Sequence, residues 1–200
     1  MSARKSNALG SRLVPTPWCT VGPFFGITVT EANSVRAIAP PDAPGERVKL
    51  VCAVFDREGK CVPDTLIEIW QANADGKYNH PADAQPKRID PAFRGFGRQI
   101  TDANGACEFQ TIKPGRVPGP RGKLQAPHLE IGVFTRGVLK LLATRIYFAG
   151  DAANAACPVL ARVPKSRRAT LLAQPVTGEQ ATWRHEIHLS GPRETVFFDV

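Results

Sequence analysis

Residues 68–78, EIWQANADGKY, begin in a strand-like apolar run and end at a tyrosine. The β-branched and aromatic residues within 65–71 predict a strand. Tyr78 follows it, and a phenol oxygen is a possible ligand for a hard metal ion. Taken alone, Tyr78 is better interpreted as a half-buried aromatic whose hydroxyl lies at a polar edge. Its role therefore depends on the partners that the rest of the chain supplies.

The flanking sequence predicts an all-β fold. Asn104-Gly105 supplies the positive backbone dihedrals of a tight hairpin, and Asp151 is placed to cap a short helix that ends before Pro158. With strands at regular spacing, the pattern is typical of a β-sandwich of seven or eight strands with long loops and a few short helices. The strands are predicted over 47–55, 65–71, 106–112, 128–134, 143–148, 182–189 and 195–199.

Length and composition favour a single domain. The 200 residues suffice for a substantial core, and 42% hydrophobic content with 18 prolines and 17 glycines suits short strands joined by turns. Residues 1–14 carry charge without an apolar stretch, so we expect a flexible lead rather than a signal peptide. The domain is expected over residues 15–200.

Charge and cysteine content exclude several classes of function. The net charge is +8, but the basic residues are scattered and no recognition motif accompanies them, so we expect no nucleic-acid partner. Five cysteines without a C-x-x-C pair argue against a disulfide framework or a zinc site and favour free thiols in the cytoplasm. No segment is apolar enough to span a membrane.

Two downstream segments bear on Tyr78. Residues 112–118, IKPGRVP, contain Val117, and residues 126–130, APHLE, contain His128 and Glu130. Together with residues 68–78, they resemble the intradiol ring-cleavage dioxygenases over nearly the whole chain, from about residue 15 to residue 200. The resemblance implies a β-sandwich of the intradiol dioxygenase type with the active site between long loops. It also implies a non-haem ferric ion held by two tyrosinates and two histidines.

Only half of that ligand set matches this chain. Tyr78 and His128 are kept, whereas Val117 replaces the second tyrosine and Glu130 the second histidine. His128 and Glu130 would still share one face of a strand, because side chains at i and i+2 point the same way. Without a second phenolate the charge and the ligand count for ferric iron are incomplete. The chain therefore resembles the iron-free alpha chain of a two-chain enzyme, with Fe(III) expected on a homologous beta chain.

The resemblance also suggests what such a chain contributes. Thr20, Gly22 and Pro23 form a T-x-G-P turn that would lie against the substrate pocket of the beta chain, and Arg136 would lie at its mouth. An arginine there can orient the carboxylate of a small aromatic substrate, a dihydroxybenzoate. Interpreted from the residues alone, the turn is a tied-down terminus and Arg136 a surface salt bridge.

Other interpretations stay open. The chain could be a non-catalytic assembly or binding module, or a self-sufficient dioxygenase with an atypical Tyr78, His128 and Glu130 site. His185 and His188 are three apart in a predicted strand, so they would face opposite sides and share no metal.

Overall fold

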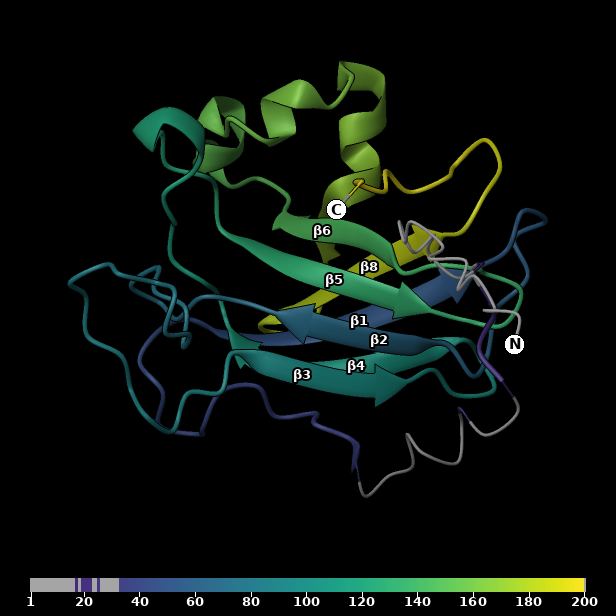
Figure 1. Ribbon diagram of the computed structural model, residues 1–200, viewed down its shortest axis with the longest axis horizontal. Coiled ribbons are helices and arrows are strands. Elements are labelled where there is room, and N and C mark those ends of the chain that lie inside the picture. The colour runs from purple at the N-terminus through teal and green to yellow at the C-terminus, as the bar shows by residue number, and fades with distance from the viewer. Residues whose placement is uncertain (1–16, 18, 23–24, 26–32, 200) are drawn as a thin grey trace, which may run out of the picture.

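The computed structural model describes residues 17, 19–22, 25 and 33–199 (Figure 1). Pro23 and the whole predicted lead, residues 1–14, lie outside the described residues, so the lead and its boundary at residue 15 stay predictions. The described residues form eight strands: β1 (Arg47–Phe55), β2 (Leu66–Trp70), β3 (Phe96–Ile100), β4 (Ala106–Ile112), β5 (His128–Phe134), β6 (Leu142–Phe148), β7 (Leu172–Pro175) and β8 (Thr182–His188).

The strands form one continuous ladder in the order β3-β2-β5-β6-β7-β8-β1-β4. Neighbours are antiparallel except for two pairs, β1 with β8 and β6 with β7. The short strand β7 joins the two halves of the ladder, because Leu172 and Ala173 pair with β6 while Gln174 and Pro175 pair with β8.

A backbone segment closes the other side, where the end strands β3 and β4 meet. The Val35 N–H donates to the Arg98 carbonyl of β3, at 2.8 Å, and the Gln110 N–H of β4 donates to the Arg36 carbonyl, at 2.9 Å. The Ile38 N–H then donates to the Gln110 carbonyl, at 2.9 Å. These bonds cover the exposed edges of both strands, so the ladder is nearly closed, like a barrel.

The core lies inside this ladder and follows the alternation of each strand. In β1, Leu50, Cys52 and Val54 are fully buried, and facing strands contribute residues such as Ile69 and Leu129. Gly97 is required at the seam, because a Cβ there would lie 2.6 Å from the Ile38 side chain.

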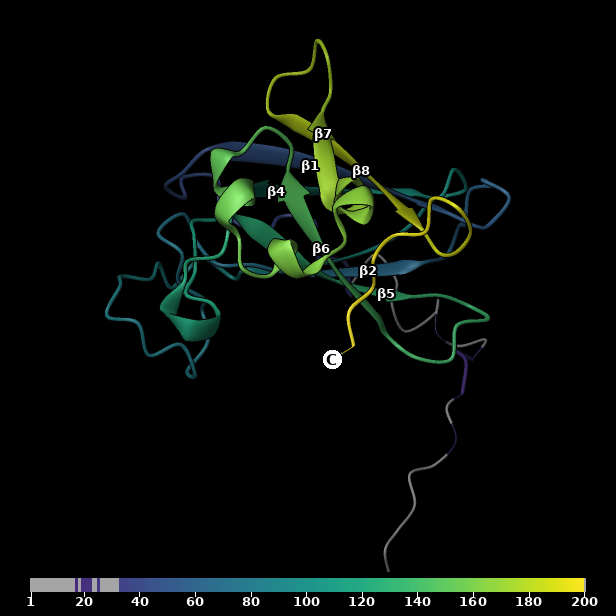
Figure 2. The ribbon, with the colours of Figure 1, turned by 90° about the horizontal axis from the view of Figure 1, so that it is seen from above.

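Short 3-10 helices gather beside β6 and β7 (Figure 2). The first, η3 (Ala152–Ala156), is the predicted one, and the Asp151 carboxylate accepts from the Ala153 N–H as its cap. Tyr147, Leu160 and Leu171 form a second buried cluster under this region. Helices η4 (Leu160–Arg162) and η5 (Lys165–Leu171) belong to the same group, whereas η2 (Pro120–Gly122) lies apart from it.

The mostly β fold with few helices is confirmed, whereas the sandwich stays a prediction because β7 joins both halves into one ladder. Strands β3 and β7 were not predicted. The strand predicted over 195–199 is wrong, since Phe198 makes only an isolated bridge to Ala143.

The five cysteines are free, as predicted. Among the described residues, no helix has the length and apolar character needed to cross a membrane.

Candidate functional site

The first residues of β5 bring together two of the four predicted metal-site positions. His128 and Glu130 share one face of the strand, and His128 Nε2 lies 3.3 Å from Glu130 Oε1. His128 is buried, and its Nδ1 lies 2.7 Å from the carbonyl oxygen of Ala126. That second contact fixes the ring orientation, so that Nε2 faces the carboxylate.

Arg145 occupies the space beside Glu130, from the paired position on β6. Its Nε donates to Glu130 Oε2 at 3.1 Å, and its Nη2 lies 2.6 Å from Oε1, which makes a two-point ion pair. The remaining guanidinium nitrogen, Nη1, donates to the Gln125 side chain at 2.8 Å. The basic partner of Glu130 is therefore Arg145.

This pair sets the electrostatics of the site. Burial acts to raise the pKa of Glu130, but the nearby His128 ring nitrogen and the charge of Arg145 outweigh it and hold the pKa below its ordinary value. Burial also acts to lower the pKa of Arg145, and Glu130 reverses that effect. Both groups are therefore charged at neutral pH.

Tyr78 lies against Trp70 at the exit of β2. The two rings stack with centroids 6.1 Å apart and an interplanar angle of 7°. Burial, followed by the negative charge of Glu130, raises the pKa of Tyr78 to about 12, so the phenol is protonated at neutral pH. The structural interpretation of Tyr78, a half-buried aromatic, matches this environment.

Val117 is buried and offers no donor atom, and an open cavity of about 390 Å³ separates its loop from that of Tyr78. Elsewhere along their length, the two loops are in direct backbone contact. A Cβ at Gly76 would overlap the carbonyl oxygen of Arg116, and a Cβ at Gly115 would overlap that of Ala74. Glycine at both positions thus sets the spacing between Tyr78 and Val117.

This arrangement does not fit a ferric ion. Both carboxylate oxygens of Glu130 already bond to the Arg145 guanidinium. The positive charge of that guanidinium opposes the binding of a second cation. Val117 is apolar and supplies no second phenolate beside Tyr78, so the anionic oxygen donors that hold ferric iron are incomplete. Among the described residues, no group of three or more His, Cys, Asp or Glu side chains is placed to hold a metal.

The predicted substrate-pocket residues lie elsewhere. The Gly137 N–H donates to Thr20 Oγ1 at 2.9 Å, so the N-terminal turn contacts the segment that carries Arg136. The Arg136 side chain is 77% exposed, with its Nη2 3.7 Å from Asp64 Oδ2, a weak surface ion pair. Gly22 is exposed in the same turn, and Pro23 lies outside the described residues.

The site at His128 and Glu130 and the segment that carries Arg136 are separated by the length of β5. Seven residues run from His128 to Phe134, which corresponds to roughly 20 Å of strand. Arg136 is two residues further along, so it cannot act on a molecule bound beside Glu130.

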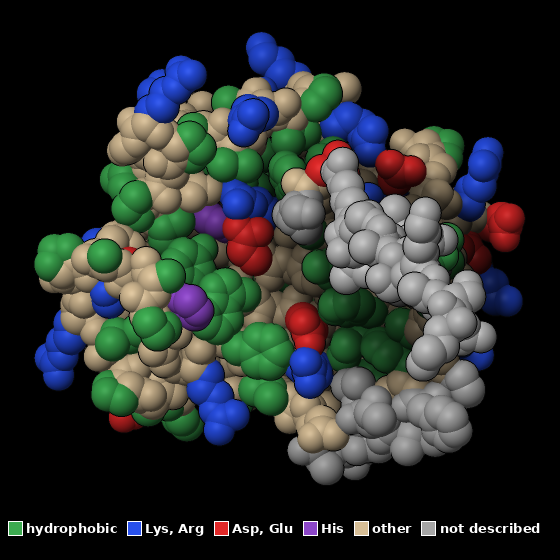
Figure 3. Space-filling model, in the orientation of Figure 1, with side chains coloured by type: hydrophobic (Ala, Val, Ile, Leu, Met, Phe, Trp, Pro, Cys, Tyr) green, Lys and Arg blue, Asp and Glu red, His purple; other side chains and the backbone are tan. Residues whose placement is uncertain are grey.

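Arg145 is the site residue that sequence reasoning missed. Its signal was a charged residue that interrupts the apolar run of 142–148, but its partner depends on strand register. On the face shown in Figure 3, Lys and Arg side chains are dispersed rather than gathered in one patch, as the sequence predicted.

Comparison with known proteins identifies relatives of this chain. A family model described as dioxygenase matches residues 20–191. The protocatechuate 3,4-dioxygenase alpha chain of Pseudomonas putida is 41% identical, over 94% of this chain and 97% of the relative. The beta chain of the Burkholderia cepacia enzyme is 39% identical, over 70% of this chain and 60% of the relative.

Solved structures support the fold. The dioxygenase domain of a dioxygenase and carbohydrate-binding fusion from Streptomyces sp. SirexAA-E has a TM-score of 0.60 and 23% identity, covering 89% of this chain and 99% of that one. Catechol 1,2-dioxygenase from Acinetobacter sp. ADP1 has a TM-score of 0.55 and 23% identity, covering 80% of this chain and 62% of that one.

Proposed function

This chain belongs to the intradiol dioxygenase family, and we propose that it is the alpha subunit of a protocatechuate 3,4-dioxygenase, which forms its catalytic unit with a homologous beta chain. The complex converts 3,4-dihydroxybenzoate and O2 to 3-carboxy-cis,cis-muconate. Fe(III) belongs to the beta chain, and this chain shapes the pocket and the assembly. Its five free cysteines support a cytoplasmic location.

The observation that carries the proposal is the ion pair between Glu130 and Arg145. A carboxylate held at two points by a guanidinium is a completed interaction, with both charges compensated. A metal site needs the opposite, an excess of negative oxygen donors. The residues at the metal position therefore support a structural role here and leave the redox chemistry to a partner.

The separation along β5 supports the contribution of the N-terminal turn and Arg136. These residues lie about a strand length from Glu130, and Arg136 extends from the surface with only a weak partner. An exposed guanidinium is available to a pocket on another chain, where it can orient the carboxylate of the substrate. The Thr20 hydroxyl positions this arginine indirectly, through its bond to the Gly137 N–H.

Co-expression with a beta chain of the family tests the proposal. We expect a stable mixed complex on size exclusion, with iron at about one ion per beta chain, a red-brown colour from tyrosinate-to-iron charge transfer, and ring cleavage. The chain purified alone should be colourless and inactive. A mixed complex that does not form would favour the non-catalytic module, and iron with activity in the lone chain would favour the self-sufficient enzyme.

A further inference from the structure

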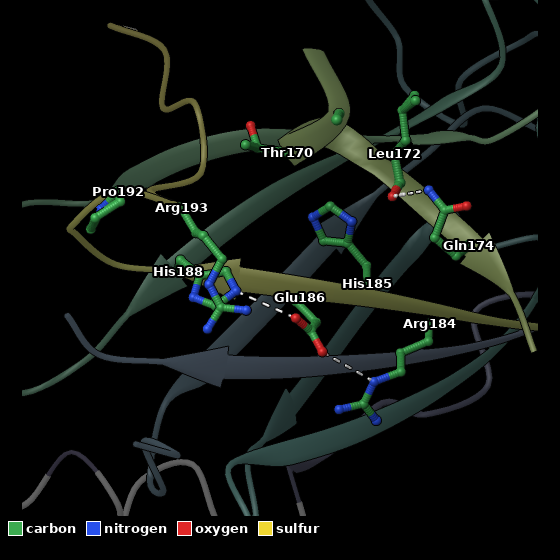
Figure 4. A pocket seen from close by; sticks show the side chains of 10 residues that line it. Thr170, Leu172, Gln174, Arg184, His185, Glu186, His188, Pro192 and Arg193 are labelled. Carbon is green, nitrogen blue, oxygen red and sulfur yellow. Dashed lines mark hydrogen bonds and ion pairs between the residues drawn. The ribbon is translucent and has the colours of Figure 1, made fainter. Parts of the chain in front are cut away.

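A second cavity lies on the far half of the ladder, beside β8. It has a volume of about 390 Å³ and is bordered by η5, β7 and the turn that follows β8 (Figure 4). That volume lies in the range of small-molecule sites. The cavity shares no lining residue with the region of Tyr78, Val117, His128 and Glu130. What it binds therefore does not depend on the proposed subunit role.

The exchange of partners by β7 creates this cavity. Leu172 and Ala173 pair with β6, and only Gln174 and Pro175 pair with β8. Beyond Arg184, β8 therefore has no β7 partner, and the two strands separate. Figure 4 shows the His185 side chain rising from β8 into this gap, toward Leu172.

His185 is the unusual group in the cavity. Its side chain is only 2% exposed, and neither ring nitrogen makes a hydrogen bond within the described part of the chain. Burial lowers the pKa of His185 to about 4, and the Leu172 backbone carbonyl, which faces the ring without completing a hydrogen bond of good geometry, acts in the opposite direction. At neutral pH the ring is uncharged, so one nitrogen can donate and the other can accept. A buried polar group without a partner destabilises the folded state, and a bound hydroxyl would offset that effect.

The rim of the cavity is mainly basic. Arg184 Nε lies 3.6 Å from Glu186, and His188 Nε2 lies 3.4 Å from the same carboxylate. Arg193 is exposed and makes no ion pair among the described residues. One carboxylate thus faces several basic groups, and Arg193 is left to attract an anion.

We propose that this cavity binds a small hydroxylated monocarboxylate of the size of a benzoate. Its carboxylate pairs with Arg193, its apolar body packs against Leu172 and Pro192, and its hydroxyl bonds to His185 at the floor. The exposed Gln174 side chain covers this floor through one long bond, 3.4 Å, to the Leu172 carbonyl. It moves aside when the ligand enters, because so weak a bond is readily exchanged.

Calorimetry with the full chain, in the absence of a beta chain, tests this inference. The probe is 3-hydroxybenzoate, compared with benzoate, which lacks the hydroxyl, 3-hydroxybenzyl alcohol, which lacks the carboxylate, and sulfate. Histidine-labelled protein, observed by imidazole nitrogen NMR, locates the bound probe, since the chain has only four histidines. The variants are Arg193→Ala and His185→Phe, with the exposed Arg94→Ala as the matched control.

We expect 3-hydroxybenzoate to bind at least fivefold more tightly than either truncated probe and to shift the His185 nitrogen signals. Arg193→Ala should weaken binding about fivefold, and Arg94→Ala should leave it unchanged. Undetectable binding, equal binding in Arg193→Ala, or equal competition by sulfate would overturn the proposal. Arg193 is at the surface, so its variant decides the question even if His185→Phe does not fold.

Discussion

At the scale of single residues, Glu130 depends on the polar side chains around it. A glutamate at position 130 could not stand on β5 without a counter-charge, because a largely buried carboxylate is costly to leave unpaired. Arg145, directly across the ladder, supplies that charge. The pair is anchored further by Gln125 and His128, so four polar side chains now form one connected group.

Removing Arg145 should therefore destabilise the fold. For Arg145→Met we expect a loss of about 1–2 kcal/mol in the free energy of unfolding at pH 7, less than for a fully buried pair because the Glu130 side chain is 35% exposed. Urea unfolding measures it. The double variant Glu130→Gln, Arg145→Met should regain part of the loss, and additive losses would contradict the coupling.

The pH dependence of that loss has a definite sign. The pKa of Glu130 is depressed in the folded state, so its stabilisation is present above the unfolded value of about 4.3 and is lost as pH falls through the folded pKa. The difference between the parent protein and Arg145→Met should therefore shrink below about pH 4.3. A difference that stays constant from pH 7 to pH 3 would show that packing, not charge, is responsible.

Arg136→Ala tests the contribution to a partner's pocket. In the mixed complex we expect kcat/KM for 3,4-dihydroxybenzoate to fall roughly five- to tenfold, mainly through KM, with iron content unchanged. Catechol, which lacks the carboxylate, should be nearly unaffected. Equal losses for both substrates would assign Arg136 to the subunit interface instead.

At the scale of elements, the loops of Tyr78 and Val117 are held by contact between two glycines and the facing backbone. Gly76 has a φ of +76° and no room for a Cβ, whereas Gly150 has a φ of +78° and nothing within 4 Å of a Cβ. Alanine substitutions at these two glycines therefore separate the effect of steric overlap from the effect of the positive φ. The Asn73 side chain, which accepts from the Asp75 and Lys77 N–H groups, fixes the same loop from within.

Gly76→Ala should destabilise the protein by about 3 kcal/mol or more, and Gly150→Ala by only about 1 kcal/mol. Chemical denaturation gives both values. Near-UV circular dichroism should change in Gly76→Ala alone, because the stacked Trp70 and Tyr78 rings lie at the end of that loop. Similar losses in both variants would mean that strain, and not the backbone contact, limits this position.

The predicted elements differ in how much local sequence specifies them. Strands with continuous β-formers, such as β1 and β5, were predicted within a residue. Strand β3 contains Gly97, a weak strand former that is required by Ile38 across the seam, and β7 has four residues ending in proline. Both strands are stabilised instead by pairing with strands that are distant in the sequence. The same limit applies to Arg145, whose partner is set by register.

At the scale of the whole molecule, closure depends on a segment that belongs to no strand. Residues 35–38 bond to β3 on one side and β4 on the other. Val35 donates its N–H to Arg98, whereas the bridge of Ala37 to Gln110 is made by the Arg36 carbonyl and the Ile38 N–H on either side of it. Proline at these two positions therefore differs in the bond that it removes.

Val35→Pro should lower the free energy of unfolding by about 1–2 kcal/mol and speed hydrogen exchange in β3 and β4. Ala37→Pro should have a clearly smaller effect, and β6 should stay protected in both variants. Exchange measured by mass spectrometry resolves these regions. If β3 and β4 stay equally protected in Val35→Pro, the segment does not hold the seam.

The ion pair between Glu130 on β5 and Arg145 on β6 also makes a metal site difficult to reach by single substitutions. Histidine at position 130 alone would leave the Arg145 charge without its partner. Removing Arg145 alone would leave the Glu130 charge without its partner. Each single step toward a metal site would thus lower the stability of the fold before any metal could bind. Tyrosine in place of the tightly packed Val117 adds a third barrier. If the proposed subunit role holds, a chain with this pair relies on its partner for iron, since building a metal site here requires several changes at once.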